Sequence, residues 1–403
     1  MMDQMVDWFG RARSRWWEWV FMALCYGGVT ALLARNFYFQ AENLISGDLW
    51  AQIHVAIDPP GSVDSFVPVY SLYRYIFRFL HWVWPNNWTY ALFVLVVALA
   101  GCLVTGAYLR AFTLCKNPAL CMLFGLGLYC ADPIFLPMLN PWRVMGLQTG
   151  GLWHNPTLLG IKLMGIVLLW LFARIAPRID TKAPAGLLCG FALAGMIGTW
   201  IKPNLVLCFY PALAIVLLIW LRQKRMKAFW RLAALAVTVL PSMGVLLWQY
   251  LLTYGESSVQ ESGFGILFGF NISLFAERPV ASVLQSLAFP LAVLMVCWRS
   301  FKRVDQYCLV WIATGVGYLQ YLFLVETGPR LTHGNWNWGV YVMVFLLFVV
   351  SFEELQCQMQ EQWRKSFQGR VWVCTCWGLL SWHVACGIVY LFAFLLQGTF
   401  VAG

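Results

Sequence analysis

Charged residues are scarce in this sequence. Only 11% of its 403 residues are Asp, Glu, Lys or Arg, whereas a soluble globular domain has roughly 25%. Hydrophobic residues account for 61% of the chain, and the mean hydropathy is +0.70. This composition excludes an ordinary soluble enzyme and predicts that most of the chain lies in a membrane.

Acidic residues are fewer than basic ones, 17 against 27, which gives a net charge of +10. Such a charge can indicate nucleic-acid binding, but here the basic residues recur at every second end of the apolar runs. The positive-inside rule assigns these ends, and with them the N-terminus, to the cytoplasm. We therefore expect membrane lipids, and no nucleic acid, as partners. The basic groups lie near residues 11–15, 110–116, 174–182, 222–231, 299–303 and 364–370.

Motifs for disulfides and for protein-held metals are missing. The 13 cysteines show no two-residue spacing of a zinc or redox motif, so we expect them to pack as apolar residues without a structural disulfide. No pair of histidines has the spacing of zinc ligands, which argues against a protein-held zinc centre. A hydrated Mg²⁺ or Mn²⁺ shared with a substrate phosphate is the more credible metal.

Apolar runs of about 20 residues dominate the chain and match the length needed to cross ~30 Å of hydrocarbon. We predict an all-α, polytopic membrane protein with about eleven transmembrane helices, forming one integral-membrane domain over residues 1–403. The first run lacks a cleavage pattern, so we expect it to be retained as a helix. The helices are expected near residues 17–35, 89–110, 118–137, 157–174, 184–201, 204–221, 232–253, 279–298, 306–325, 337–352 and 371–397.

Two external loops are of special interest: a long first loop, 36–88, and a short last loop, 326–338. Residues 67–83 of the first loop mix aromatic and aliphatic residues with Arg74, Arg78 and His81. A spanning helix would bury these charges, so we expect an amphipathic helix lying at the membrane interface.

Asp48 follows Gly47 in the run Ser-Gly-Asp-Leu-Trp, shortly after the first helix. A carboxylate at the membrane surface can accept a proton from a hydroxyl or bind a divalent cation, and a neighbouring glycine permits close approach of backbone or substrate. Asp48 is therefore a candidate catalytic base and a candidate metal ligand. The same run also fits an N-cap of an interfacial helix, and both interpretations stay open.

Polar residues also surround the start of the predicted fourth helix. His154 and Asn155 precede Pro156, which suits a first helical turn, so Asn155 fits an N-cap. Both are also candidate substrate-binding residues. Lys162 lies deeper in the same helix, where a cation needs a phosphate or carboxylate partner unless its side chain snorkels to the interface.

Lys202 is a second candidate cation, in the sequence Lys-Pro-Asn at an external junction between two helices. It could pair with Glu277 or Asp132, or it could bind a lipid phosphate. The junction itself fits a tight hairpin or a kink in one long helix, and the hairpin keeps both flanking basic loops cytoplasmic.

The last external stretch, ETGPRLTHGNWNWG, concentrates the most varied chemistry. An arginine can grip a phosphate with two parallel hydrogen bonds, while Asn and Trp side chains bond and stack a sugar ring. The structural alternative is a tight loop in which Glu326 bridges to Arg330 and the tryptophans anchor the interface. The candidate substrate-binding residues here are Glu326, Arg330, His333, Asn335, Asn337 and Trp338.

This order of features resembles the GT-C superfamily of integral-membrane glycosyltransferases. The shared features are a cytoplasmic N-terminus, one helix, a long external loop with an early acid and amphipathic helices, then many helices and a late external loop. The one shared motif is SGDLW, in which Asp48 matches the family's first-loop acid. The family's paired-acid signature is absent, because the nearest acidic neighbour is Glu42. The runs WHNPT, IKPN and ETGPRLTHGNWNWG are similar to those of uncharacterised bacterial membrane proteins of this type.

The resemblance implies transfer of a sugar from a polyprenyl-phosphate donor to a glycan, lipid or protein acceptor. The reaction would occur at the extracytoplasmic face of a bacterial inner (plasma) membrane, as part of cell-envelope synthesis. Asp48 would deprotonate the acceptor hydroxyl or orient it through a cation, and Arg330 with Lys162 or Lys202 would neutralise the departing phosphate. A cavity facing the outer leaflet would admit the lipid.

Two other functions remain open. A transporter or flippase for lipid-linked or anionic solutes would also place cations and aromatics in the membrane, although such folds often show two related halves and a midplane site. A surface-glycan polymerase or ligase would use lipid-linked substrates too, and Arg330 with His333 would suit it. A purely structural or assembly role is the remaining alternative.

Overall fold

The computed structural model describes residues 8–43, 47–58, 71–148, 150–151, 153–181, 183–224, 228–254 and 263–397. The structure is 80% helical, and the described residues contain one two-stranded sheet, which confirms the all-α class. Within these ranges, eight helices are long and apolar enough to cross a membrane. The fold is therefore compatible with an integral membrane protein.

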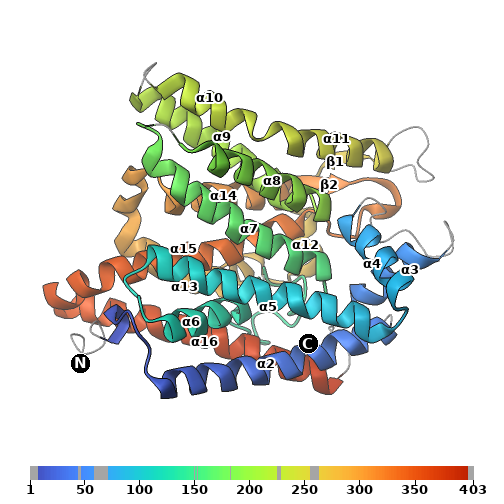
Figure 1. The fold of residues 1–403 in the computed structure, drawn as a ribbon, viewed down its shortest axis with the longest axis horizontal. Helices are drawn as coiled ribbons and strands as arrows, with labels where there is room; N and C mark the ends of the chain where they lie inside the picture. The colour runs from blue at the N-terminus through green and yellow to red at the C-terminus, as the bar shows by residue number, and fades with distance from the viewer. Residues whose placement is uncertain are drawn as a thin grey trace.

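The elements follow one another with short links. In chain order the helices are α2 (Trp16–Glu42), α3 (Asp48–Ile57), α4 (Leu72–Val83), α5 (Asn87–Phe112), α6 (Pro118–Cys130), α7 (Pro156–Ile175), α8 (Ala185–Ile201), α9 (Asn204–Lys224), α10 (Phe229–Val237), α11 (Leu240–Tyr254), α12 (Phe270–Phe275), α13 (Pro279–Cys297), α14 (Gln306–Phe323), α15 (Asn337–Lys365) and α16 (Phe367–Gln397). The strands are β1 (Phe264–Ile266) and β2 (Leu324–Glu326). Figure 1 shows α3, α4, β1 and β2 together at one end of the helix bundle.

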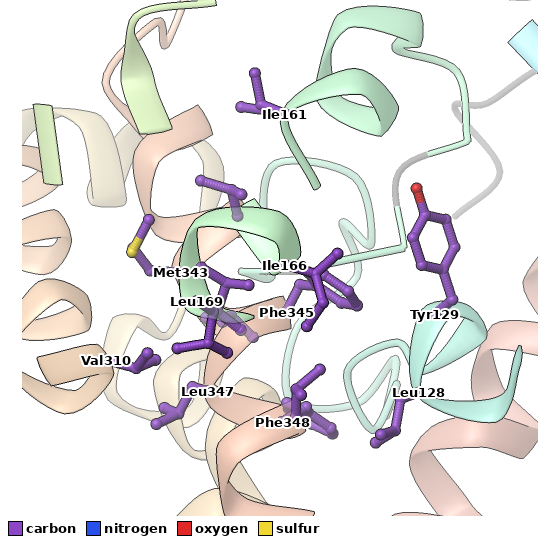
Figure 2. Close-up of a cluster of buried hydrophobic side chains, with 14 of the residues drawn as sticks. Leu128, Tyr129, Ile161, Ile166, Leu169, Val310, Met343, Phe345, Leu347 and Phe348 are labelled. Atoms are coloured by element: carbon purple, nitrogen blue, oxygen red, sulfur yellow. The ribbon is translucent and has the colours of Figure 1, made fainter. Parts of the chain in front are cut away.

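Helix α15 lies at the centre of the bundle. It contacts α5, α6, α7, α9, α13, α14 and α16, and 89% of its most apolar window is buried, so protein rather than lipid surrounds it. Figure 2 shows Met343 and Leu347 of this helix packed with Leu169 of α7 and Val310 of α14. Close van der Waals packing of these side chains is the main force that holds the helices together around α15, because lipid is as apolar as they are.

The first helix is longer than predicted. Helix α2 continues to Glu42, so the expected start of the first loop at residue 36 was wrong. Asn36 and Gln40 are buried, and their amides donate to the Leu391 carbonyl at 3.5 Å and the Trp153 carbonyl at 3.3 Å. These polar side chains resemble a loop in the sequence, but tertiary partners keep them inside the helix.

Helix α15 also extends beyond its predicted end at residue 352, as far as Lys365. The sequence Phe-Glu-Glu indicated the end of a membrane run, but both acids have partners from neighbouring elements. Glu353 accepts hydrogen bonds from the Tyr108 hydroxyl at 2.7 Å and the Gln306 amide at 2.6 Å. Glu354 accepts one from the Ser300 hydroxyl at 2.6 Å. The acids therefore fix the helix against α5, α14 and the end of α13.

Helix α6 is shorter than predicted. It ends at Cys130, although the apolar run continues to residue 137. Asp132 precedes Pro133, and a residue before proline disfavours the helical conformation. The Asp132 N–H donates instead to the His383 carbonyl of α16 at 3.1 Å. The chain then runs without an α-helix, in the parts described, until α7.

A polar stripe on α13 provides hydrogen-bond partners for this segment, whose described residues between 131 and 155 form no α-helix. We call this stretch of the chain the non-helical segment. The Gln285 amide donates to the Ile134 carbonyl at 2.9 Å, and the Ile134 N–H donates to the Gln285 carbonyl at 3.0 Å. The Gln148 N–H donates to Ser286 Oγ at 2.9 Å, and its side chain donates to Ser282 Oγ at 2.8 Å. Side chains of α13 thus replace the main-chain hydrogen bonds that a helix would supply.

The junction at Lys202 is a hairpin. A Cβ added to Gly198 of α8 would lie 3.0 Å from the Leu205 side chain of α9, and one added to Gly195 would lie 2.0 Å from the Tyr210 hydroxyl. The pair Gly198 and Leu205 lies near the turn, and the pair Gly195 and Tyr210 lies farther from it on both helices. Such contacts require that the chain reverses direction at Lys202. The hairpin interpretation is confirmed, and small residues on α8 permit the close approach.

The predicted amphipathic helix is present as α4, while residues 67–70 lie outside the described ranges. Tyr73 and Phe77 are buried, whereas the polar residues Arg78 and His81 are exposed. Two-faced burial of this kind confirms the amphipathic character of the helix.

Strands β1 and β2 were not predicted. They pair antiparallel, with Phe264 opposite Glu326 and Ile266 opposite Leu324. Three residues per strand are too few to give an alternating pattern in the sequence. The pairing ties the stretch just before α12 to the last external loop.

The Gln285→Leu variant should lower the free energy of unfolding by about 1–3 kcal/mol, because it leaves the buried Ile134 carbonyl without its side-chain donor. Thermal unfolding of the purified protein in detergent would measure the loss. Leu284→Ala, at an exposed position one residue earlier, is the control and should change little. Equal loss in both variants would contradict a specific role for the α13 stripe.

Candidate functional site

Asp48 is the first residue of α3, and its carboxylate does not cap the helix. Gly47 occupies the N-cap position without a side-chain bond, so the capping interpretation of Asp48 was wrong. The carboxylate instead accepts a hydrogen bond from Asn155 Nδ2, and the Asp48 N–H donates to the His154 carbonyl at 2.9 Å. Asp48 is only half-buried, so its carboxylate is held in place but accessible.

Gly47 permits this close approach. Its φ is +152°, and an added Cβ would lie 2.6 Å from Gln40 Oε1 and 3.0 Å from the His154 carbonyl oxygen. Both the conformation and the space therefore require glycine. The sequence predicted that a glycine beside Asp48 permits the close approach of backbone or substrate. The structure confirms this for backbone.

Asn155 links the helix start to the candidate base. Its Oδ1 accepts hydrogen bonds from the Leu158 N–H and the Thr157 hydroxyl, each at 2.8 Å, which confirms the predicted N-cap of α7. The Lys202 ammonium donates to the same oxygen at 3.4 Å. Since Nδ2 donates to Asp48, a single amide connects a carboxylate and an ammonium while its orientation is fixed by the helix.

Lys202 lies over the Trp338 ring, with its ammonium 3.7 Å from the ring centroid. Its described partners are thus Asn155 and Trp338, rather than Glu277 or Asp132. Burial lowers the pKa of Lys202 to about 7, although Asp48 acts in the opposite direction. The charge of this ammonium therefore depends on small changes in its surroundings near neutral pH.

His154 is buried, and its ring centroid lies 6.3 Å from that of Trp338. Burial lowers its pKa to about 4; Asp48 raises it and Lys202 lowers it further. The imidazole is therefore neutral at physiological pH, so at this position it can act through hydrogen bonding rather than through a positive charge.

The last loop reaches the same end of the molecule. The Asn204 amide donates to the Asn335 carbonyl at 2.8 Å, and Asn204 follows the Lys202 turn directly. Asn337 is the first residue of α15 and is fully buried beside Trp338. Four segments that the sequence indicated separately, around residues 48, 154, 202 and 335, therefore converge.

Glu326 organises the rest of this loop. It accepts hydrogen bonds from Asn335 Nδ2 and, at 2.6 Å, from the Tyr254 hydroxyl. Arg330 Nε lies 3.4 Å from Glu326 Oε1. The Glu326–Arg330 bridge expected for a purely structural loop is therefore present. Burial lowers the pKa of half-buried His333, with Arg330 acting in the same direction and Glu326 against it.

Lys162 is fully buried, which contradicts snorkelling to the interface. Its ammonium donates to the Tyr129 carbonyl at 3.0 Å and lies 3.7 Å from the Tyr129 ring centroid and 4.6 Å from that of Phe345. Main chain and aromatic faces thus surround this cation. A role toward a phosphate stays a prediction.

Sequence reasoning missed one buried ion pair. Arg143 Nη2 and Nε lie 2.8 and 3.1 Å from Asp132 Oδ2, and both residues are buried. The two residues lie in the non-helical segment, where no helical or strand spacing relates them. The available signal was an Asp-Pro pair that interrupts an apolar run, followed by an isolated arginine.

The donor set limits how a metal could bind. Among the residues described, no group of three His, Cys, Asp or Glu side chains is placed to hold a metal ion. A cation at Asp48 would therefore need further oxygen ligands from substrate phosphate and water. The use of Mg²⁺ or Mn²⁺ stays a prediction.

No family model matches the chain, and no curated protein matches it. Any function must therefore be argued from the side chains themselves.

The Gly47→Ala variant should destabilise the protein by about 1–3 kcal/mol, because alanine at this φ is strained and its methyl group would collide with Gln40. Gly127→Ala is a matched control, since a Cβ at residue 127 meets only Val384, at 3.7 Å. Unfolding in detergent measures both. An unchanged stability for Gly47→Ala would argue against the tight contact between α3 and His154.

Lys202 should make stability rise with pH. Its pKa is lowered in the folded protein, from 10.5 to about 7, so the unfolded chain binds more protons between these values and loses them as the pH increases. Wild type should therefore gain stability relative to Lys202→Met from pH 7 upward. Thermal unfolding midpoints over this window test it.

Lys302→Met, at an exposed position, is the control for that experiment. Its midpoints should follow those of wild type at every pH. If the Lys202→Met curve also runs parallel to wild type, Lys202 does not carry the pH dependence.

Proposed function

We propose that this protein is an integral-membrane glycosyltransferase of the GT-C type, transferring a sugar from a polyprenyl-phosphate donor to an acceptor at the extracytoplasmic face. The observation that carries the proposal is the convergence of four segments distant in sequence. They bring together the half-buried carboxylate of Asp48, the amide of Asn155, the ammonium of Lys202 and the indole of Trp338. A structural turn does not require a base, a cation and an aromatic face in one place.

The chemistry follows from the arrangement around Asp48. Asn155 orients the carboxylate, which takes the proton of an acceptor hydroxyl as the oxygen attacks the anomeric carbon. The bond from that carbon to the phosphate oxygen breaks, and the configuration inverts. The departing phosphate gains negative charge, which the Lys202 ammonium stabilises from the other end of the Asn155 amide.

Arg330 plays a second role in this proposal. In the structure its guanidinium lies beside Glu326, 3.4 Å away, and the Arg330 side chain is 11% exposed. A donor phosphate competes with Glu326 for the guanidinium, and paired hydrogen bonds to phosphate are stronger than an ion pair at this distance. His333 and Asn335 then line the sugar, while Asn337 supports the start of α15.

The proposed orientation is supported by where the basic residues lie. Helices α7 and α15 both begin at the candidate site, and their last turns carry Arg174 and the pair Arg364 and Lys365. The candidate site thus lies at the first turns of these helices, and the basic residues lie at their opposite ends. By the positive-inside rule, the site is extracytoplasmic and the N-terminus cytoplasmic, with about eleven spans in a bacterial inner membrane.

Purified protein should bind a polyprenyl-phosphate sugar and transfer the sugar to an acceptor. Asp48→Asn should retain donor binding and reduce transfer at least 100-fold, because the amide cannot act as a base. Arg330→Ala should weaken donor binding about tenfold or more, because a bidentate phosphate contact is lost. Scintillation binding and product chromatography measure the two effects.

Glu361→Gln, exposed near the basic end of α15, is the control and should alter neither binding nor transfer. No donor binding by folded wild type would overturn the proposal. Transfer at the wild-type rate by Asp48→Asn would remove Asp48 as the base.

One observation favours a transporter as the second candidate. The non-helical segment 131–155 is packed inside an apolar bundle, and broken helical elements of this kind form solute sites in many transporters. Movement of a lipid-linked sugar across proteoliposomes without formation of a glycosylated product would favour this function over transfer.

A further inference from the structure

A second polar site lies between the non-helical segment and α16, outside the contacts of Asp48. Asp132 is 2% exposed, and Arg143 binds only one of its carboxylate oxygens, Oδ2. The other oxygen, Oδ1, is buried and has no hydrogen-bond partner among the described residues. A buried carboxylate oxygen without a donor is costly unless a small ligand supplies one.

A small cavity lies against this carboxyl. Its volume is about 10 Å³, and its polar walls include Asp132, Gln148 and Ser286. Such a volume has room for one water molecule. Figure 2 shows Leu128, Phe345 and Phe348, which form the apolar side of the cavity.

Gly151 keeps the space beside Oδ1 open. A Cβ added to this glycine would lie 3.0 Å from Asp132 Oδ1 and 3.3 Å from the Ala131 carbonyl oxygen. Any larger residue would therefore crowd the free carboxylate oxygen. The glycine is thus a second feature, independent of the cavity, that leaves room for a ligand there.

The main chain fixes the carboxyl in place. The Asp132 N–H donates to the His383 carbonyl at 3.1 Å, and His383 Nδ1 donates to the Asp132 carbonyl at 2.7 Å. These two bonds attach the segment to the middle of α16. The backbone at Asp132 is therefore fixed against α16, and Arg143 holds the carboxylate through Oδ2.

We propose that Asp132 is a buried proton-binding site served by one water molecule in this cavity. The water hydrogen-bonds to Oδ1 and passes a proton to it, so that the carboxylate becomes a neutral carboxylic acid and the water receives its replacement proton from solvent. Burial favours the neutral acid, whereas the Arg143 cation favours the carboxylate. The two effects oppose each other, which is what permits titration.

Arg143 keeps other interaction partners whether Asp132 is ionised or protonated. It also donates to the Cys386 carbonyl, and its guanidinium carbon lies 4.4 Å from the Tyr390 ring centroid and 5.4 Å from that of Phe135. Protonation of Asp132 therefore leaves the cation hydrogen-bonded and over an aromatic face rather than isolated.

The other groups around Asp132 set the electrostatic environment. Lys162 of α7 favours the carboxylate, and α6 contributes the Cys130 thiol. Helix α16 contributes His383, Cys386 and Tyr390, while α13 and α15 contribute only uncharged walls, Ser286 and phenylalanines. Among the described residues, Arg143 is the cation hydrogen-bonded to Asp132, so the proton competes mainly with this ion pair.

Infrared difference spectroscopy of the full chain in detergent tests the site. Burial, opposed by Arg143, raises the pKa of Asp132 above its ordinary value. Acidification from neutral pH to about pH 5.5, where exposed carboxylates stay ionised, should therefore produce a carboxylic-acid C=O band in wild type that is absent from Asp132→Asn. In D₂O the band should shift, because the cavity water exchanges. Asp180→Asn, at an exposed position, is the control and should retain the band.

Gly151→Ala provides a second variant that leaves both charges in place. Its methyl group crowds Oδ1, so the band should change frequency or lose its D₂O shift while the protein stays folded. A band that persists unchanged in Asp132→Asn, or no difference between wild type and Gly151→Ala, would overturn the proposal. Glycosyl transfer does not enter the readout, so this result is independent of the function proposed for Asp48.

Discussion

Hydrogen bonding of a non-helical main chain inside an apolar bundle is the constraint on which the rest of the structure depends. Segment 131–155 interrupts the helices between α6 and α7, and each of its buried amides and carbonyls needs a partner that lipid cannot provide. His383 of α16 binds its start, the polar stripe of α13 binds its middle, and Asn155 ends it by capping α7. Because the same Asn155 amide holds Asp48 and Lys202, the solution to a folding problem also positions the candidate site.

Local signals in the sequence were sufficient for much of the fold. Each of the eleven predicted helical segments contains an α-helix, and the Asn155 cap follows from short-range rules for proline and helix ends. At Lys202 the local rules left a hairpin or a kink open, and the cytoplasmic placement of the flanking basic loops favoured the hairpin. Most errors at helix ends depend on distant partners, although the Asp132-Pro133 pair is also a local stop signal. Helix α6 stops where Asp132 meets α16, and α15 continues because Tyr108 and other distant residues accommodate its acids.

The candidate site was predictable as a set of residues but not as an arrangement. The sequence indicated Asp48 and Lys202 separately, and only the fold shows that Asn155 connects them. Trp338 was expected to stack a sugar, yet the Lys202 ammonium occupies one face of its ring. Arg330 was expected to bind phosphate, and the structure places it beside Glu326. Substrate would therefore bind by replacing contacts within the protein, which sequence patterns do not encode.

The most direct test of this account is a structure by electron cryo-microscopy with a polyprenyl-phosphate sugar bound. The account predicts the sugar-phosphate head group between Asp48 and Lys202, with the phosphate in contact with the Lys202 ammonium or the Arg330 guanidinium. A head group bound instead along residues 131–148, or remote from all four converging segments, would contradict it.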